Sequence, residues 1–239
     1  MSIIAGVHPV LEALTAGRSI ERLHIARGSG GPRVQQIIDH ARQAGIPVRF
    51  EPRPSLDRLS RQAAHQGVVA IASEQRYAAL DSLIGQASLL VLLDGVTDPH
   101  NLGAIIRTAH AAGADAIVVP DRRAAPLTEI AAKAAAGALE HLPVARIGNL
   151  TQAIETLKES GFWIYGLDER GDVAYDQASF DGRIAFVLGG EGEGLHQHVR
   201  KRCDFLVRIP LAGRISSLNV SVACGIVLFE WKRRRSMAR

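Results

Sequence analysis

The sequence of 239 residues contains only two cysteines, Cys203 and Cys224. Two thiols are too few for a disulfide framework or for a zinc site built on a cysteine cluster. No apolar run approaches the roughly 20 residues that a membrane-spanning helix needs. The first residues, MSIIAG, lack the basic start and the long apolar stretch of a signal peptide. We therefore expect a cytoplasmic protein that does not associate with a membrane.

Lysine is also scarce, because 24 of the 28 basic residues are arginines. An arginine-rich genome would account for that ratio, but it would not explain where the charge lies. Residues 1–80 hold ten arginines, no lysine and six acidic residues, so the whole net charge of +4 lies there. The planar guanidinium suits phosphates and base edges. This asymmetry indicates a polyanionic partner for the first third of the chain.

Hydrophobic spacing divides the chain into two parts. Residues 1–73 are typical of a small α/β unit, with helices expected at 6–16 and 34–44 and strands at 23–26, 48–50 and 68–72. Residues 74–86 carry no strong period and are expected to form a linker. At 47% hydrophobic and 22% charged residues, the composition is that of an ordinary globular protein and excludes a disordered chain.

From residue 87 onward, strands and helices alternate. Strands are expected at 89–93, 116–119, 162–165, 184–188 and 205–209, and helices at 101–112, 126–137, 150–160 and 219–235. The strands are continuous apolar runs, as in parallel sheets that are buried on both faces. The pattern predicts an α/β domain over 87–239 with a mostly parallel sheet and helices on both faces.

The first of three unusual loops, DGVTDPHNLG at 94–103, follows a predicted strand. Ligands in open α/β sheets bind at the carboxyl ends of strands. Asn101 stands at the start of the next helix, where it could cap the helix or face a ligand. Arg107 lies among apolar residues of that helix and therefore needs an anionic or polar partner.

The second loop, LGGEGEG at 188–194, lets the backbone approach a ligand closely, although a plain flexible turn is the alternative. It lacks the G-x-G-x-x-G spacing, and Glu191 and Glu193 would repel a pyrophosphate but tolerate a cation. The third loop, 209–220, places Ser216, Ser217 and Asn219 before the last helix. One of them is expected to cap that helix, and three polar groups exceed what one cap requires.

Together these loops resemble the three motifs of the SPOUT superfamily, TrmH branch. Asn101 and Arg107 match the first motif, Gly189-Gly190-Glu191-Gly192 the second and Ser217-Leu218-Asn219-Val220 the third. GVHPV at 6–10 and HQGVV at 65–69 resemble the substrate-binding domain of that branch, so the resemblance covers nearly the whole chain. The strings DGVTDPHNLGA and SSLNVSVA are most similar to its 23S rRNA guanosine 2′-O-methyltransferases.

The resemblance implies transfer of a methyl group from S-adenosyl-L-methionine (AdoMet) to a ribose 2′-hydroxyl, with no metal. The implied target is a guanosine in the peptidyl-transferase region of 23S rRNA, or of a large-subunit precursor. The implied catalytic side chains are Asn101, Arg107, Glu191, Ser217 and Asn219, and the implied AdoMet contacts are the backbone at Gly189, Ile209 and Leu218. A deep trefoil knot over about 189–235 and a homodimer with the C-terminal helix near its interface are also implied.

The arginines expected to contact RNA are Arg18, Arg22, Arg27 and Arg33, although the loop between the last two would equally serve as a simple connector. Because a guanidinium stays protonated in proteins, Arg107 is a poor general base. We expect it to favour ionisation of the 2′-hydroxyl or to hold a phosphate. His196 and His198 lack a third ligand in motif spacing, so no metal is assigned.

Three other functions compete with this interpretation. A TrmH-type tRNA ribose methyltransferase would use the same motifs. A non-enzymatic RNA-binding relative would not need all five polar side chains. A nicotinamide-dependent oxidoreductase is disfavoured by the missing phosphate-binding glycine pattern.

Overall fold

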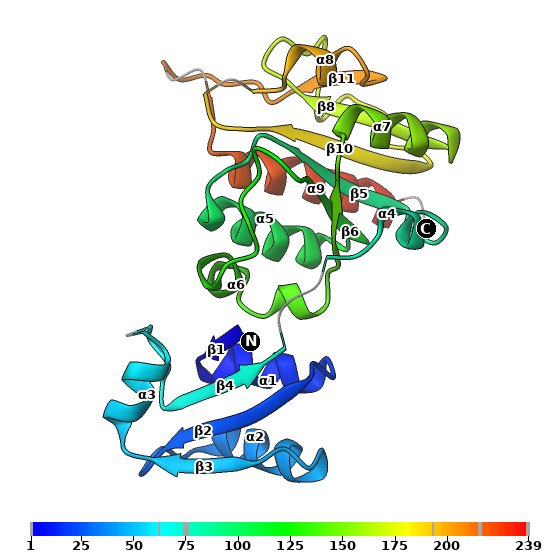
Figure 1. Ribbon diagram of the computed structural model, residues 1–239. Helices are drawn as coiled ribbons and strands as arrows, with labels where there is room; N and C mark the ends of the chain where they lie inside the picture. Colours follow the sequence, from blue (N-terminus) through cyan, green and yellow to red (C-terminus); the bar gives the residue numbers. More distant parts are fainter. Residues whose placement is uncertain (1, 62, 74–76, 193, 215–216, 238–239) are drawn as a thin grey trace. The chain divides into compact units, whose positions relative to one another are not determined.

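The computed structural model describes residues 2–61, 63–73, 77–192, 194–214 and 217–237. Glu193, Ser216 and the start of the expected linker, 74–76, lie outside the described residues. The chain forms two compact units (Figure 1). The first unit contains residues 1–76 and 127–141, and the second contains 77–126 and 142–239.

The first unit is built on a four-stranded sheet with the order β1-β4-β2-β3. Its strands are β1 (Ser2–Ala5), β2 (Ile20–Ala26), β3 (Val48–Glu51) and β4 (Val68–Ala72). β4 runs antiparallel to both of its neighbours, whereas β2 and β3 are parallel. This confirms a small α/β unit at the N-terminal end.

Helices cover both faces of this sheet. α1 (Val7–Thr15) and α2 (Pro32–Gln43) bury their apolar sides on one face, where Leu23 and Ile25 are fully buried. α3 (Arg53–Leu59) places Leu56 against Ala26 and Val69 on the other face. The unit also contains α6 (Glu129–Ala135) and the 3-10 helix η1 (Ala138–Glu140).

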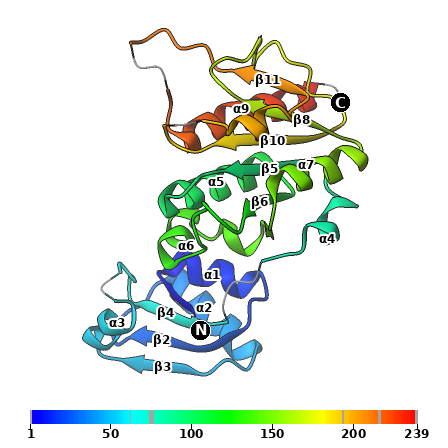
Figure 2. The same cartoon turned by 45° about the horizontal axis from the view of Figure 1, so that its top comes forward.

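The second unit contains a seven-stranded sheet with the order β7-β6-β5-β10-β8-β11-β9. Figure 2 labels β5, β6, β8, β10 and β11 of this sheet. The strands are β5 (Leu89–Asp94), β6 (Ala116–Pro120), β7 (Val144–Ile147), β8 (Phe162–Leu167), β9 (Val173–Ala174), β10 (Arg183–Gly189) and β11 (Phe205–Arg208). Their pairings are parallel, as predicted. The carboxyl ends of these strands therefore share one edge, which is where the three unusual loops begin.

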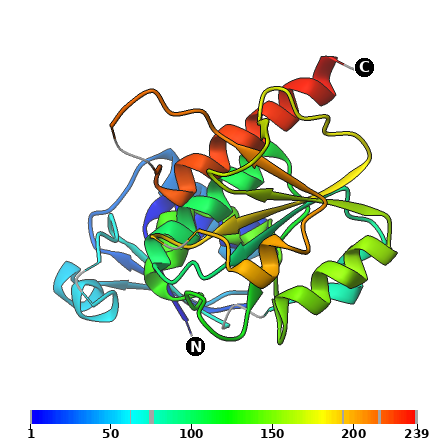
Figure 3. The ribbon, with the colours of Figure 1, turned by 90° about the horizontal axis from the view of Figure 1, so that it is seen from above.

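Helices flank this sheet on both faces, which confirms the predicted layers (Figure 3). α5 (Pro99–Ala112) and α9 (Val220–Met237) lie side by side on one face, where the Lys232 ammonium donates a hydrogen bond to the Ala111 carbonyl at 2.8 Å. α4 (Leu80–Ile84), α7 (Leu150–Glu159) and α8 (Gln197–Arg200) bury apolar side chains against Leu90, Leu92 and Val187 on the other. No helix among the described residues is long and apolar enough to cross a membrane.

Some elements differ from the sequence-based expectations. The helix expected at 126–137 is shorter, because Thr128 caps α6 by accepting from the Ala131 N–H and Ala136 takes a left-handed φ of 50°. β1 was missed because its four residues are all half-buried and show no alternation. The sequence pattern did not indicate α3, because proline inside a helix breaks it; Pro54 lies in the first turn, where proline is tolerated. The C-terminal knot stays a prediction.

Candidate active site

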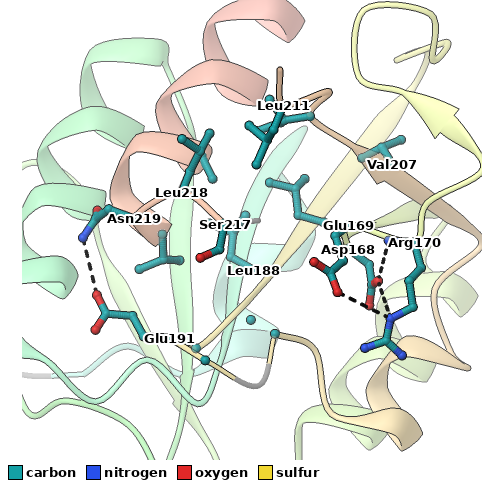
Figure 4. A pocket seen from close by; sticks show the side chains of 18 residues that line it. Asp168, Glu169, Arg170, Leu188, Glu191, Val207, Leu211, Ser217, Leu218 and Asn219 are labelled. Atoms are coloured by element: carbon teal, nitrogen blue, oxygen red, sulfur yellow. Dashed lines mark hydrogen bonds and ion pairs between the residues drawn. The ribbon is translucent and has the colours of Figure 1, made fainter. Parts of the chain in front are cut away.

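The carboxyl ends of β8, β10 and β11 and the entry to α9 surround a cavity of about 520 Å³ (Figure 4). This volume lies within the roughly 300–1,000 Å³ that is usual for small-molecule sites. Apolar side chains line much of the wall: Leu188, Val207, Ile209, Leu211 and Leu218. The second and third unusual loops thus meet at one site, and all three expected AdoMet contacts, Gly189, Ile209 and Leu218, line it.

Two glycines let the chain pack tightly at the floor of the cavity. Gly189 ends β10 and pairs with Asp94 of β5, and the Gly190 N–H donates to the Asp94 carbonyl at 2.7 Å. A Cβ atom on Gly190 would overlap the Gly95 carbonyl, and one on Gly189 would overlap the carbonyl of Gly194. Glycine is therefore required here by the approach of neighbouring backbone, which a plain flexible turn would not need.

Three polar side chains, one from each motif, form a directed hydrogen-bond chain. Asn219 caps α9, because its Oδ1 accepts from the Ser221 N–H at 2.9 Å. With Oδ1 occupied in this way, its amide nitrogen donates to Asn101 Oδ1 at 2.9 Å and lies 3.4 Å from Glu191 Oε1. The amide of Asn101 in turn donates to that same Glu191 oxygen. Loops more than 100 residues apart along the chain thus hold one carboxylate in place.

Of the two alternatives for Asn101, capping of its own helix is excluded. Asp98 caps α5 instead, with its Oδ1 accepting from the His100 N–H at 2.9 Å. Asn101 lies inside the first turn and is 7% exposed. A buried amide requires partners, and Glu191 and Asn219 supply them.

A second polar pair was not anticipated from the sequence. Asp94, at the end of β5, is 6% exposed and accepts from the backbone N–H and the Nδ1 of His196, each at 2.8 Å. The pair ties the loop after β10 to the neighbouring strand. His196 was considered only as a metal ligand, and the described part of the chain contains no group of three metal-ligating side chains. The position of Asp94 at a strand end was the available signal.

Arg107 does not join this group within its own chain. Its side chain is exposed and forms no hydrogen bond or ion pair with any residue that the structure describes. Six residues along a helix correspond to a rotation of about 240° from Asn101. The guanidinium is therefore open to a partner outside the chain. Ser217 lines the cavity.

The four arginines expected to contact RNA have different surroundings. The Arg18 side chain is 9% exposed and donates to Glu140 Oε1 at 2.5 Å and to the Ser73 carbonyl at 2.7 Å. Arg22 is half-buried beside Glu21. Arg27 and Arg33 are exposed, and their side chains bond to no described residue. Only these last two have guanidinium groups that are fully available to a ligand.

Both cysteines behave as small apolar residues. Cys224 is fully buried in α9, and Cys203 is half-buried against the core beneath α7. Burial raises the pKa of each thiol to about 12, so neither is a reactive thiolate near neutral pH.

Comparison with protein families gives two matches that follow the two parts of the sequence. Residues 88–229 match the SpoU rRNA Methylase family, and residues 3–78 match the family model for RNA 2′-O ribose methyltransferase substrate binding. YacO of Bacillus subtilis strain 168, whose name assigns it to the TrmH family of tRNA/rRNA methyltransferases, is 41% identical over 241 residues. That alignment covers 98% of this chain and 96% of YacO.

Solved structures show the same fold with the methyl donor bound. An AdoMet-bound rRNA methyltransferase from Sinorhizobium meliloti is 31% identical, with a TM-score of 0.83 over 98% of this chain and 87% of that one. The SpoU methyltransferase AviRb from Streptomyces viridochromogenes in complex with AdoMet is 27% identical, with a TM-score of 0.82 over 99% and 91%. The chain therefore belongs to the SpoU/TrmH family of RNA 2′-O-ribose methyltransferases, which take their methyl group from AdoMet.

Proposed function

We propose that the protein methylates the ribose 2′-hydroxyl of a specific guanosine in 23S rRNA, in free RNA or in a large-subunit precursor. Two observations support this target. The strings DGVTDPHNLGA and SSLNVSVA are most similar to 23S rRNA methyltransferases of the branch, and the Sinorhizobium meliloti relative is an rRNA methyltransferase. The name of YacO includes both tRNA and rRNA, so tRNA is the competing substrate.

The observation that carries the enzymatic assignment is the hydrogen-bond chain from Asn219 through Asn101 to Glu191 beside the cavity. When bound, AdoMet supplies a methyl group on a sulfonium sulfur. The backbone at Gly189, Ile209 and Leu218 would hold it, because these residues line the cavity. Ser217 and the three linked side chains would orient the ribose hydroxyl. Such positioning supplies a large part of the acceleration of a displacement reaction.

Arg107 would act on the attacking oxygen rather than remove its proton. Its permanent charge stabilises the negative charge that develops on the 2′-oxygen, or it holds the adjacent phosphate. As the new oxygen–carbon bond forms and the sulfur–carbon bond breaks, the hydroxyl proton passes to water or to a phosphate oxygen. The exposed position of Arg107 suits both roles, because an RNA or a second subunit can reach it.

We further propose a homodimer formed through α5 and α9. Val222 and Phe229 are 50% and 47% exposed, and with half-buried Ile226 they make an apolar stripe at helical spacing on α9. The stripe has no cover within the described chain, and a second copy would remove it from water.

The position of Arg107 connects this interface to the proposed site. Thr108, the neighbour of Arg107, packs against Gly225 of α9. The same interface would therefore enclose Arg107. Sedimentation of the Phe229→Asp variant as a monomer would support this interface.

In the first unit, we propose that Arg27 and Arg33 contact the RNA backbone, with a smaller part for Arg22. Arg27 and Arg33 are exposed, and the lack of partners for their side chains among the described residues supports this role. Arg18 is left out because its guanidinium already bonds within the unit. Neutralising phosphate contacts should lower RNA affinity and flatten its dependence on salt.

The decisive experiment incubates the protein with labelled AdoMet and ribosomal RNA from a strain that lacks the enzyme, and then maps the labelled ribose. Label on one 23S guanosine is the expected result. Label confined to tRNA, offered in a parallel reaction, would contradict the rRNA target. AdoMet binding without transfer to either RNA would instead indicate an inactive RNA-binding relative.

A further inference from the structure

The turn that follows β8 forms the wall of the cavity across from Glu191 (Figure 4). β8 pairs with β10, with Leu167 opposite Leu188, so the turn lies next to the glycine loop. We propose that Glu169 in this turn binds the two ribose hydroxyls of AdoMet. This inference rests on the proposed use of the cavity for the methyl donor and assigns one part of that donor to one side chain.

The turn is held rigidly against β11. The Asp168 N–H donates to the Val207 carbonyl at 3.1 Å, and the Gly171 N–H closes the turn by donating to the Asp168 carbonyl at 2.9 Å. The Arg208 guanidinium donates to the Gly171 carbonyl at 2.5 Å. A Cβ atom on Gly171 would lie 2.7 Å from the carbonyl carbon of Val207, so no larger residue fits. Glu169 is therefore presented from a preorganised backbone, which lowers the entropy lost on binding.

The other carboxylates of the cavity are already occupied. The Asp168 side chain is 6% exposed, accepts from the Arg170 N–H at 2.9 Å and faces the Arg200 guanidinium at 3.8 Å. It stabilises the turn itself. Glu191 accepts the amide of Asn101 and lies beside that of Asn219. Neither group keeps all of its lone pairs for a ligand.

Glu169 differs from both. Its side chain is 62% exposed, and its contact with the Arg170 guanidinium, at 3.8 Å, is too long for a hydrogen bond. Among the cavity residues that the structure describes, it is the carboxylate whose oxygens accept no hydrogen bond. An ionised carboxylate only accepts, and its two oxygens can take two donors side by side.

The ribose of AdoMet offers such a pair of donors in its vicinal hydroxyls. The neighbouring wall is apolar, with Leu188, Val207 and Leu211, and suits the adenine ring better than the sugar. In dinucleotide-binding sheets, an acidic residue beyond a neighbouring strand holds a ribose hydroxyl beside a glycine loop. Here β8 and β10 create the same juxtaposition on a sheet that lacks the dinucleotide motif.

Calorimetry with two ligands tests the assignment. S-Adenosylhomocysteine contains the ribose and the amino acid part, whereas 5′-methylthioadenosine contains the ribose but no ammonium group. Glu169→Gln should bind both ligands about tenfold more weakly than the wild type, because a hydrogen bond to a charged acceptor is lost. 5′-Methylthio-2′-deoxyadenosine should bind the wild type more weakly than 5′-methylthioadenosine, and Glu169→Gln should discriminate between the two much less.

Glu159 is an exposed glutamate at the end of α7, outside the cavity. Glu159→Gln is therefore the matched control and should bind both ligands like the wild type. Equal thermal unfolding of the variants would show that the fold is intact. Unchanged affinity of Glu169→Gln for both ligands would overturn the inference. A loss for S-adenosylhomocysteine alone would assign Glu169 to the ammonium group and overturn it as well. If the wild type bound neither ligand, the proposed donor site itself would fail.

Discussion

Arg18 in the first unit and Asn219 in the second both satisfy their polar atoms within the protein, but the outcomes differ. Arg18 links Glu140 and the Ser73 carbonyl, and this removes it from the surface. Asn219 caps α9 and, through the same side chain, aligns Asn101 beside the cavity. Internal pairing therefore takes Arg18 out of the proposed RNA contacts, whereas it aligns the polar side chains of the proposed site in the second unit. Arg27, Arg33 and Arg107 are exposed, and their side chains pair with no described residue, so they are available to a partner.

Arg107 gives the strongest test, because it is the proposed site residue whose side chain has no partner among the described residues. Arg107→Ala should lower turnover about 10²–10³-fold, as expected for loss of one charge-stabilising group. AdoMet affinity and stability should hardly change, because an exposed side chain contributes within about 0.5 kcal/mol. Single-turnover methylation and calorimetry measure the two quantities separately. Unchanged turnover would remove Arg107 from the reaction.

Mixed dimers sharpen the same test. If Arg107 serves the partner's cavity, co-expressed Arg107→Ala and Glu191→Ala chains should regain activity that neither variant has alone. One cavity of each mixed dimer would then combine an intact Glu191 with an intact Arg107. Failure to recover any activity, with dimers verified by sedimentation, would place both residues in one chain's site.

In the first unit, replacement of Arg18 should lower stability, whereas replacement of Arg27 and Arg33 should weaken RNA binding. Arg18→Ala leaves Glu140 buried without its cation, so the free energy of unfolding should fall by about 3 kcal/mol. Arg27→Ala with Arg33→Ala should leave stability unchanged and weaken RNA binding about tenfold at low salt, with a flatter salt dependence. Urea unfolding and filter binding measure these effects. Weaker RNA binding by Arg18→Ala at unchanged stability, together with lower stability of the Arg27→Ala, Arg33→Ala variant, would contradict these roles.

Asn219 has two roles that a pair of variants can separate. Asn219→Ser keeps a capping oxygen but loses the amide that donates to Asn101. Its stability should stay near that of the wild type while turnover falls about 10²-fold. Asn219→Ala should lose the same activity and a further roughly 1 kcal/mol of stability. If Asn219→Ser remained fully active, the amide chain would have no part in catalysis.

The smallest effect concerns the thiols, which are confined to the second unit. Because burial raises the pKa of Cys203 and Cys224 to about 12, against 9.0 for a free thiol, the folded state keeps their protons longer. Their contribution to stability is complete below pH 9 and is lost as the pH rises toward 12. At pH 8, labelling with Ellman's reagent should be slow and should follow unfolding of the second unit alone. Rapid labelling of the native protein would contradict this.

The sequence could predict the layers and the meeting of the second and third loops, because parallel strands share a carboxyl edge and glycine and amide residues follow them. It also predicted a cap among the polar residues before α9, which is Asn219. It could not show which arginine is buried, because the partner of Arg18 lies 122 positions away. The bond between Asp94 and His196, 102 positions apart, was invisible for the same reason. The knot implied by the resemblance stays a prediction, and threading of a chain would leave no local sequence pattern.

Because Asn219 both caps α9 and bonds to Asn101, formation of the last helix and arrangement of the polar side chains depend on each other. Since one amide both starts the last helix and aligns the buried Asn101, this hydrogen-bond arrangement cannot form until α9 has docked beside α5. A chain that lacked this helix would leave Glu191 without one of its two amide neighbours, and the proposed donor site would be incomplete.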